Sequence, residues 1–331
     1  MERIAFISGG TFIYWSSIIL ALAAATAIAI FVATYLAKGG DVLALSLAIP
    51  VSMVSSVVLS RLIHWYCRED AYESIRVAMT DYTSGGFALM GVFAGCLLTA
   101  CLLRLIRISK NLPQMLDAMA IGGGAGIAVG RLASLFNASD RGMILADTVG
   151  MPFAYPVTNA VSGVVENRLA TFMLQSITTA GIVAALLLYM LITALRKRKL
   201  KDGDVFLIFL PAYSVCQVIF DSTRYDSLYL RSNGFVSVVQ ILGAVGLVAA
   251  IVVFSVRMVK NAGKFKIWFV GIWLAILGLL GGAGYMEYYV QRHGNQAAFA
   301  YTVMGACLLA VVLIVLIIRA LGIPKKDKIL V

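Results

Sequence analysis

Residues 130–142 read GRLASLFNASDRG, and they mark the point where a long apolar segment ends in a polar turn. The apolar segment runs from Leu116 to Phe136 and is interrupted only by Asp117, glycines and Arg131. An arginine near the end of a membrane-length segment either extends to the water interface or meets a buried anion. An ionisable residue at this place, followed by a polar turn, indicates a functional site, and the alternative is simple anchoring.

The composition is that of an integral membrane protein. Of the 331 residues, 61% are hydrophobic and 13% are charged, and the mean hydropathy is +0.93, whereas about 25% of a soluble domain is charged. The net charge of +11 does not indicate nucleic-acid binding, because the basic residues lie in short loops between apolar segments. The five cysteines show no metal-ligand spacing. Neither a metal nor another cofactor is expected for this chain.

Nine apolar segments are long enough to cross a membrane. They predict an all-α polytopic membrane protein, a bundle of about nine transmembrane helices with no soluble domain between them. The fourth segment contains four glycines between residues 122 and 126, which suit close helix packing or, alternatively, the broken helix of a transporter. The segments are residues 11–37, 42–66, 84–106, 113–136, 170–195, 204–222, 234–256, 267–286 and 298–320.

The distribution of basic residues predicts the orientation. Most of the 27 basic residues lie in one set of alternate loops, and the positive-inside rule places those loops in the cytoplasm. We therefore expect the N-terminus outside and the C-terminus in the cytoplasm. The longest loop, residues 143–169, is then external. Its prolines, glycines and apolar residues predict a small cap, and the alternative is a loop with no role beyond connection.

Three arginines near segment ends, Arg61, Arg131 and Arg224, are predicted to lie at the outer membrane boundary. Because the positive-inside rule disfavours cations there, these arginines need an anionic partner. The phosphate of a phospholipid headgroup is the natural one, since a guanidinium group binds phosphate bidentately. The alternative is that they pair with nearby aspartates for anchoring alone. The chain has no P-loop, HExxH or GxSxG motif that would indicate another class of enzyme.

Four stretches, in order along the chain, carry a resemblance to prolipoprotein diacylglyceryl transferase. That family has a signature of the form G-R-x-G-N-F-x-N-x-E-x-x-G, which Gly130, Arg131, Asn137 and Gly142 match in register. The other three are Ser60-Arg61-Leu62 (family A-R-L-x-Y), residues 85–95 (family G-G-x-x-x-H-G-x-x-x-G), and residues 221–226 with Ser237 and Gln240 (family E-F-x-R-x-D and S-x-x-Q). The likeness runs from about residue 11 to 257, so we predict a seven-span core over 1–257 and an extra two-span hairpin over 258–331.

The resemblance implies an activity, partners and a location. The activity is transfer of a diacylglyceryl group from phosphatidylglycerol to the lipobox cysteine of prelipoproteins in the bacterial plasma membrane. The expected partners are phosphatidylglycerol, or a similar anionic phospholipid, and the signal peptide of a prelipoprotein. The implied headgroup-binding residues are Arg61, Arg131, Ser134, Asn137, Gly142, Asp221, Arg224 and Gln240.

The departures from the family pattern concern the acid–base residues. Met90 stands in the place of the family histidine, and Ser139 stands in the place of the signature glutamate, with Asp140 one position further on. If a catalytic base survives, His64 and Asp140 are the candidates. Three interpretations therefore remain: an active transferase with altered acid–base residues, a catalytically degenerate protein that binds phospholipid or lipoprotein, and a transporter.

Overall fold

The computed structural model describes residues 3–81, 85–137, 139–145, 153–159, 162–197, 200–231, 233–293 and 296–323. The chain divides into two compact units, which are described separately. The first unit comprises Met1–Phe209 and Thr223–Val239, and the second comprises Leu210–Ser222 and Gln240–Val331. These units are defined by contacts within the chain. The expected division into a seven-span core over 1–257 and a hairpin over 258–331 concerns the family resemblance and stays a prediction.

Within the described residues, nine apolar helices coincide with the nine predicted segments. Eight are long and apolar enough to cross a membrane, and α4 is shorter, at 17 residues. The prediction of an all-α polytopic membrane protein is therefore confirmed, and the chain is a multi-pass membrane protein. The helices are α1 (Trp15–Ala37), α2 (Val42–Cys67), α4 (Leu89–Leu105), α5 (Leu112–Gly130), α6 (Thr171–Leu195), α7 (Asp204–Ser222), α8 (Val238–Ala262), α9 (Trp268–His293) and α10 (Ala297–Leu321).

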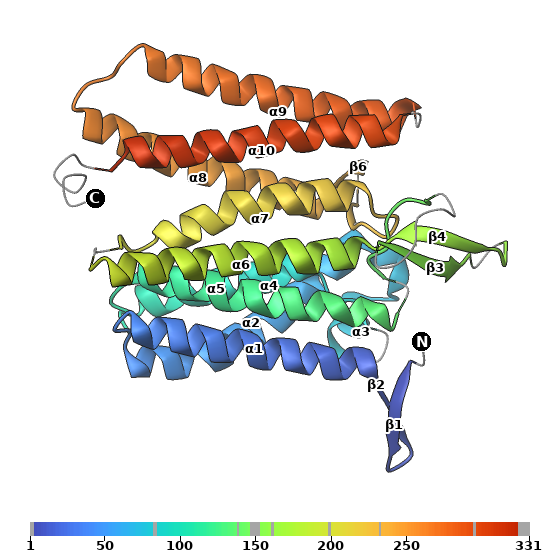
Figure 1. Cartoon of the computed structure of the whole chain (residues 1–331). Coiled ribbons are helices and arrows are strands. Elements are labelled where there is room, and N and C mark those ends of the chain that lie inside the picture. Colours follow the sequence, from blue (N-terminus) through green and yellow to red (C-terminus); the bar gives the residue numbers. More distant parts are fainter. Residues whose placement is uncertain are drawn as a thin grey trace. The chain divides into compact units, whose positions relative to one another are not determined.

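Three two-stranded antiparallel hairpins were not expected from the apolar pattern. They pair β1 (Ile4–Ser8) with β2 (Thr11–Tyr14), β3 (Ala154–Thr158) with β4 (Val165–Leu169), and β5 (Tyr229–Leu230) with β6 (Asn233–Ser237). The segments expected to start at 11 and 234 therefore begin as strands, and their helices start at Trp15 and Val238. In the first unit, the β1–β2 and β3–β4 hairpins lie at the same end of the helices (Figure 1).

Glycines allow the helices of the first unit to approach closely. A Cβ atom added at Gly122 of α5 would lie 2.6 Å from the carbonyl oxygen of Ala27 in α1, and one at Gly95 of α4 would lie 2.5 Å from the Cα of Ser56 in α2. Helix α5 is continuous from Leu112 to Gly130. The glycines therefore serve helix packing, and the broken-helix interpretation of this segment is wrong.

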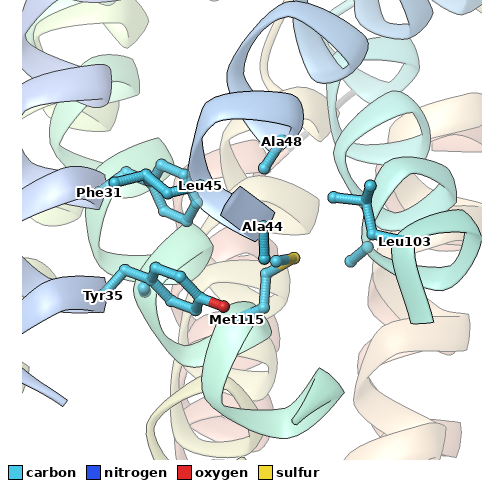
Figure 2. Packing of buried hydrophobic residues seen from close by; sticks show 9 residues of the cluster. Phe31, Tyr35, Ala44, Leu45, Ala48, Leu103 and Met115 are labelled. Atoms are coloured by element: carbon cyan, nitrogen blue, oxygen red, sulfur yellow. The ribbon is translucent and has the colours of Figure 1, made fainter. Parts of the chain in front are cut away.

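A buried apolar cluster joins four helices of the first unit (Figure 2). Tyr35 of α1 and Met115 of α5 are its large, fully buried members, at 2% and 0% exposed. Leu103 comes from α4, and small alanines of α2 fill the space between the larger side chains. The full set is Phe31, Tyr35, Ala44, Leu45, Ala48, Ala100, Leu103, Met115 and Ala118.

A buried carboxylate connects three helices of the first unit. Asp117 of α5, which is 1% exposed, forms an ion pair with Lys38, the residue that follows α1. Its two carboxylate oxygens also accept hydrogen bonds from the backbone nitrogens of Gly203 and Phe206, each at 2.8 Å, at the start of α7. Asp117 therefore caps the N-terminus of α7, where backbone N–H groups have no partner within the helix.

Candidate active site

The polar turn that the sequence predicts as a functional site begins where α5 ends. Helix α5 is followed by a short 3₁₀ helix, Arg131–Leu135. The side-chain oxygen of Asn137 then accepts a hydrogen bond from the backbone nitrogen of Ser139 at 3.0 Å. Asp140 adopts a φ of 56°, in the left-handed region that aspartate tolerates better than most residues. Asn137 thus shapes the turn, and the turn sets the direction of the Asp140 side chain.

Asp140 brings two of the three predicted arginines together. One oxygen, Oδ1, lies 2.7 Å from Nη1 of Arg131 and 2.8 Å from Nη2 of Arg224. The other oxygen, Oδ2, accepts a hydrogen bond from Ser134 Oγ at 2.7 Å. The side chains of Arg131, Arg224 and Asp140 are only 12%, 13% and 14% exposed. We call Arg131, Asp140 and Arg224 the arginine clamp.

Asp226, in the residues that follow α7, supports the arginine clamp. Its Oδ1 lies 2.9 Å from Nε of Arg224, and its Oδ2 accepts a hydrogen bond from the backbone nitrogen of Asp140 at 2.9 Å. Asp226 thereby ties the residues after α7 to the turn after α5. In the sequence, the D-S-T-R-Y-D stretch indicates a role for Asp226 beside Arg224. The stretch does not predict the contact of Asp226 with the backbone of Asp140.

The arginines determine the ionisation of Asp140. Burial raises the pKa of this carboxyl group, but the charges of Arg131 and Arg224 and the hydrogen bond from Ser134 outweigh burial and hold the pKa well below its usual range. Asp140 is therefore a carboxylate at neutral pH, and hydrogen bonds and ion pairs occupy both of its oxygens. This environment orients the arginines and makes Asp140 a poor proton acceptor.

Arg141 is not among the site residues that the sequence predicts. Its side chain is 3% exposed and lies between two aromatic rings, with Cζ 4.9 Å from the ring centre of Tyr155 in β3 and 4.4 Å from that of Phe172 in α6. Its Nη2 donates to the carbonyl oxygens of Ser134 and Asn137, at 2.8 and 3.0 Å. Burial lowers the pKa of Arg141, and nearby Tyr155 and Asp140 oppose that effect. Arg141 thus fixes the turn against the β3–β4 hairpin.

The predicted external cap packs on the same turn. Gly142 donates its backbone N–H to the carbonyl oxygen of Leu169 in β4 at 2.8 Å, and a Cβ atom at Gly142 would lie 2.5 Å from Thr171 Oγ1. Arg168 of β4 pairs with Glu166 at 2.7 Å and stacks on Tyr225, with Cζ 4.8 Å from the ring centre. Within the described residues, the segment 143–169 thus contains a hairpin that packs on this turn, and residues 146–152 and 160–161 lie outside the described residues.

Arg61 has a different environment from the other two arginines. It is 1% exposed, and its guanidinium group donates to the carbonyl oxygens of Ala78 at 2.7 Å and Gly86 at 3.0 Å, as well as to those of Asp81 and Gly85. These contacts hold the segment that leads from α2 to α4. A direct role for Arg61 in headgroup binding stays a prediction, and its contacts indicate support of this segment.

His64 lies beside Arg61 in the same part of the first unit. Its Nδ1 is 2.8 Å from the hydroxyl oxygen of Tyr72, and the two rings meet edge to face. Tyr72 OH also accepts a hydrogen bond from Arg61 Nη1 at 3.2 Å. Met90, in the place of the family histidine, is buried at the start of α4 with 7% of its surface exposed.

The remaining predicted site residues belong to the second unit. Asp221 is 2% exposed near the end of α7. Gln240 Nε2 donates to Ser222 Oγ at 3.1 Å and to Glu287 Oε1 at 3.0 Å. Neither Ser222 nor Glu287 was among the residues predicted from the sequence.

Comparison with known proteins agrees with the resemblance found in the sequence. The family model described as prolipoprotein diacylglyceryl transferase matches residues 3–256. A phosphatidylglycerol–prolipoprotein diacylglyceryl transferase of Clostridioides difficile is 27% identical over 268 residues, which cover 80% of this chain and 100% of that protein. The protein of the same name from Oceanobacillus iheyensis is 26% identical, covering 73% and 85%, and that from Gloeobacter violaceus is 32% identical, covering 49% and 60%.

Proposed function

This chain belongs to the prolipoprotein diacylglyceryl transferase family, and on that premise we propose that it transfers a diacylglyceryl group from phosphatidylglycerol to the lipobox cysteine of prelipoproteins. The setting is the bacterial plasma membrane. The observation that carries the proposal is the arginine clamp, in which Arg131 and Arg224 converge on the Asp140 carboxylate. Two guanidinium groups held side by side form a site for one phosphate group.

The reaction places a specific demand on such a site. The cysteine thiol loses its proton to a base, and the thiolate sulfur forms a bond with the glyceryl carbon that carries the phosphate. The bond between that carbon and the phosphate oxygen breaks, and glycerol phosphate leaves with the electron pair. Negative charge therefore grows on the phosphate as the bond breaks, and fixed cations beside it stabilise the transition state more than the bound substrate.

Arg131 has hydrogen-bond donors to offer a phosphate group. Among the described residues, its Nη1 bonds to Asp140, while its Nε is buried without an acceptor. A buried donor without a partner is costly unless a ligand satisfies it. Asp140 keeps both arginines in place without using all the donors of Arg131, so a phosphate oxygen can bind beside the carboxylate.

His64 is the better candidate for the base. Asp140 is held as a carboxylate by two arginines and a serine hydroxyl, so it accepts a proton poorly. Hydrogen bonding between His64 Nδ1 and the Tyr72 hydroxyl fixes the orientation of the imidazole ring.

A catalytically degenerate lipid-binding protein is the second candidate function. The observation that favours it is Met90, which places a buried thioether where the family has a histidine. A thioether does not accept a proton at neutral pH, and general-base catalysis contributes about 10²–10⁴-fold to a rate.

Complementation tests the proposal directly. Cells depleted of their own transferase would express this chain, and the lipidation of a test prelipoprotein would be measured alongside the amount of protein in the membrane. We expect lipidation by the wild type and its loss in Arg131→Ala and Arg224→Ala. The matched control is Arg76→Ala, which removes an exposed arginine of α3 (Ile75–Thr80). Absence of lipidation by a well-expressed wild type, with phosphatidylglycerol still bound, would favour the second function.

A further inference from the structure

Helices α9 and α10 follow the part of the chain that the family model matches, which ends at residue 256. Both helices nevertheless contact residues inside the matched part. Glu287 of α9 accepts a hydrogen bond from Gln240 at the start of α8, and Tyr301 of α10 donates one to the backbone of Ser222 at the end of α7. All four residues belong to the second unit, in which α9 and α10 run side by side (Figure 1).

The hydrogen bonds around Gln240 leave its amide one orientation. Ser222 Oγ donates to the carbonyl oxygen of Val218 at 2.8 Å, so its single hydrogen is used and it can only accept from Gln240. The carboxylate of Glu287 is also an acceptor, and its Oε1 receives the amide nitrogens of Gln240 at 3.0 Å and Gln291 at 2.7 Å. The nitrogen of Gln240 must therefore face these two partners, and its carbonyl oxygen points away from them.

The contact from α10 acts on the same place. Tyr301 OH donates to the carbonyl oxygen of Ser222 at 2.9 Å. Ser222 is the last residue of α7, where backbone carbonyl groups receive no hydrogen bond from an N–H group of the same helix. The tyrosine satisfies one of these groups and fixes the backbone of the residue whose hydroxyl group meets Gln240.

We propose that Glu287 and Tyr301 are positioning residues of the transferase, which makes the α9–α10 hairpin a working part of the enzyme in addition to a membrane anchor. Glu287 acts by fixing the Gln240 amide, and Tyr301 acts by fixing Ser222. Both targets lie in stretches that carry the family resemblance, the segment 221–226 and the S-x-x-Q pair. The inference rests on the proposed function.

The test uses the full-length chain in the complementation assay and in purified form. Glu287→Met keeps the length of the side chain and removes the acceptor, whereas Glu287→Gln keeps an acceptor oxygen. We expect Glu287→Met to lower kcat by roughly ten-fold, Glu287→Gln to retain most of the rate, and Tyr301→Phe to lose roughly two- to ten-fold, the effect of one hydrogen bond. Trp273→Phe is the matched control, because it removes a 3.0 Å hydrogen bond from α9 to Ser255 of α8.

A double-mutant cycle separates positioning from general support. In the background of Gln240→Leu, Glu287→Met should cause no further loss of rate. Independent, multiplicative losses in the cycle would overturn the inference, and so would an unchanged rate in Glu287→Met. If Glu287→Met does not fold, an unchanged rate in Tyr301→Phe overturns it. If the wild type transfers no lipid, the proposed function fails, and the double-mutant cycle is then measured by melting temperature. Additive losses of melting temperature from Gln240→Leu and Glu287→Met would overturn the positioning of Gln240 by Glu287.

Discussion

Asp140→Asn is the substitution that tests the arginine clamp most directly. Asparagine has nearly the same size as aspartate but carries no charge, so Arg131 and Arg224 lose their shared counter-ion. The three side chains are 12%, 13% and 14% exposed, so water screens the remaining charges poorly. Removing one partner from a buried ion pair costs about 3–5 kcal/mol of folding stability, and here Arg131 loses its carboxylate while Arg224 keeps its pair with Asp226.

The assay is thermal unfolding in a neutral detergent, with and without added lipid. We expect Asp140→Asn to unfold at a lower temperature than the wild type. Phosphatidylglycerol should then raise the melting temperature of the variant more than that of the wild type, because its phosphate group replaces the missing carboxylate between the arginines. Transfer activity should fall, since Asp140 no longer orients the two guanidinium groups.

The control and the refuting result are equally specific. Asp202→Asn alters an aspartate that lies 3.4 Å from Lys38 and is 40% exposed, so we expect it to cost at most about 1 kcal/mol. The reasoning fails if Asp140→Asn unfolds like the wild type, or if phosphatidylglycerol stabilises it no more than a zwitterionic lipid does.

The pH dependence of the wild type follows from the same carboxylate. Its pKa is lowered in the folded state, so the unfolded chain binds the proton more readily. The stability that Asp140 contributes is therefore fully present above the ordinary carboxyl pKa of 3.8 and declines as the pH falls toward the lower folded-state value. Between neutral pH and about pH 5, the difference in melting temperature between wild type and Asp140→Asn should stay constant, and it should narrow in stronger acid. A difference that narrows near pH 6 would contradict this assignment.

Four further predictions concern the site and the helix bundle. Arg131→Ala should weaken phosphatidylglycerol binding by about 2–5 kcal/mol. Arg131→Lys should recover only part of this binding, because an ammonium group cannot bind phosphate bidentately. Equal binding of vesicles by the wild type and both variants would contradict a headgroup role for Arg131. A reporter fused to the C-terminus should be cytoplasmic and one inserted at Asn159 should be outside, so finding both on one side would disprove the predicted orientation. Gly95→Leu should lower the melting temperature, since its Cβ would lie 2.5 Å from the backbone of Ser56, and an unchanged midpoint would show that α2 and α4 can separate without loss. Under the second candidate function, in which the wild type lacks a base, Met90→His should raise the rate of lipidation by up to about 10²–10⁴-fold if the ring reaches the thiol. An unchanged rate in Met90→His would agree with His64 as the base.

Hydropathy predicted the helices well because the bilayer imposes a minimum length on each apolar segment. It could not separate strands from helices where a short apolar stretch precedes a helix. Residues 4–14 are rich in isoleucine and phenylalanine on both sides of Gly9 and Gly10. These two glycines have φ values of 55° and 79° and form the turn of the β1–β2 hairpin, a signal that the apolar count does not register.

The site was predictable at the level of motifs and not at the level of contacts. The signature placed Arg131 and Arg224 in one site because family motifs meet in space. The partners of Asp140 depend on its left-handed backbone conformation, which no simple periodicity predicts. The position of Arg61 near a helix end predicts a place beside Arg131 and Arg224, but the carbonyl groups that surround it come from a segment whose path the sequence does not specify.

The ion pair between Lys38 and Asp117 bears on how the chain is assembled during synthesis. Lys38 is synthesised first, directly after α1, and it is available as a partner when Asp117 of α5 is made. The carboxylate is then already in place when the first turn of α7 is made, and it receives the N–H groups of Gly203 and Phe206. The order of synthesis therefore makes a partner for each of these polar groups available before the next helix is added.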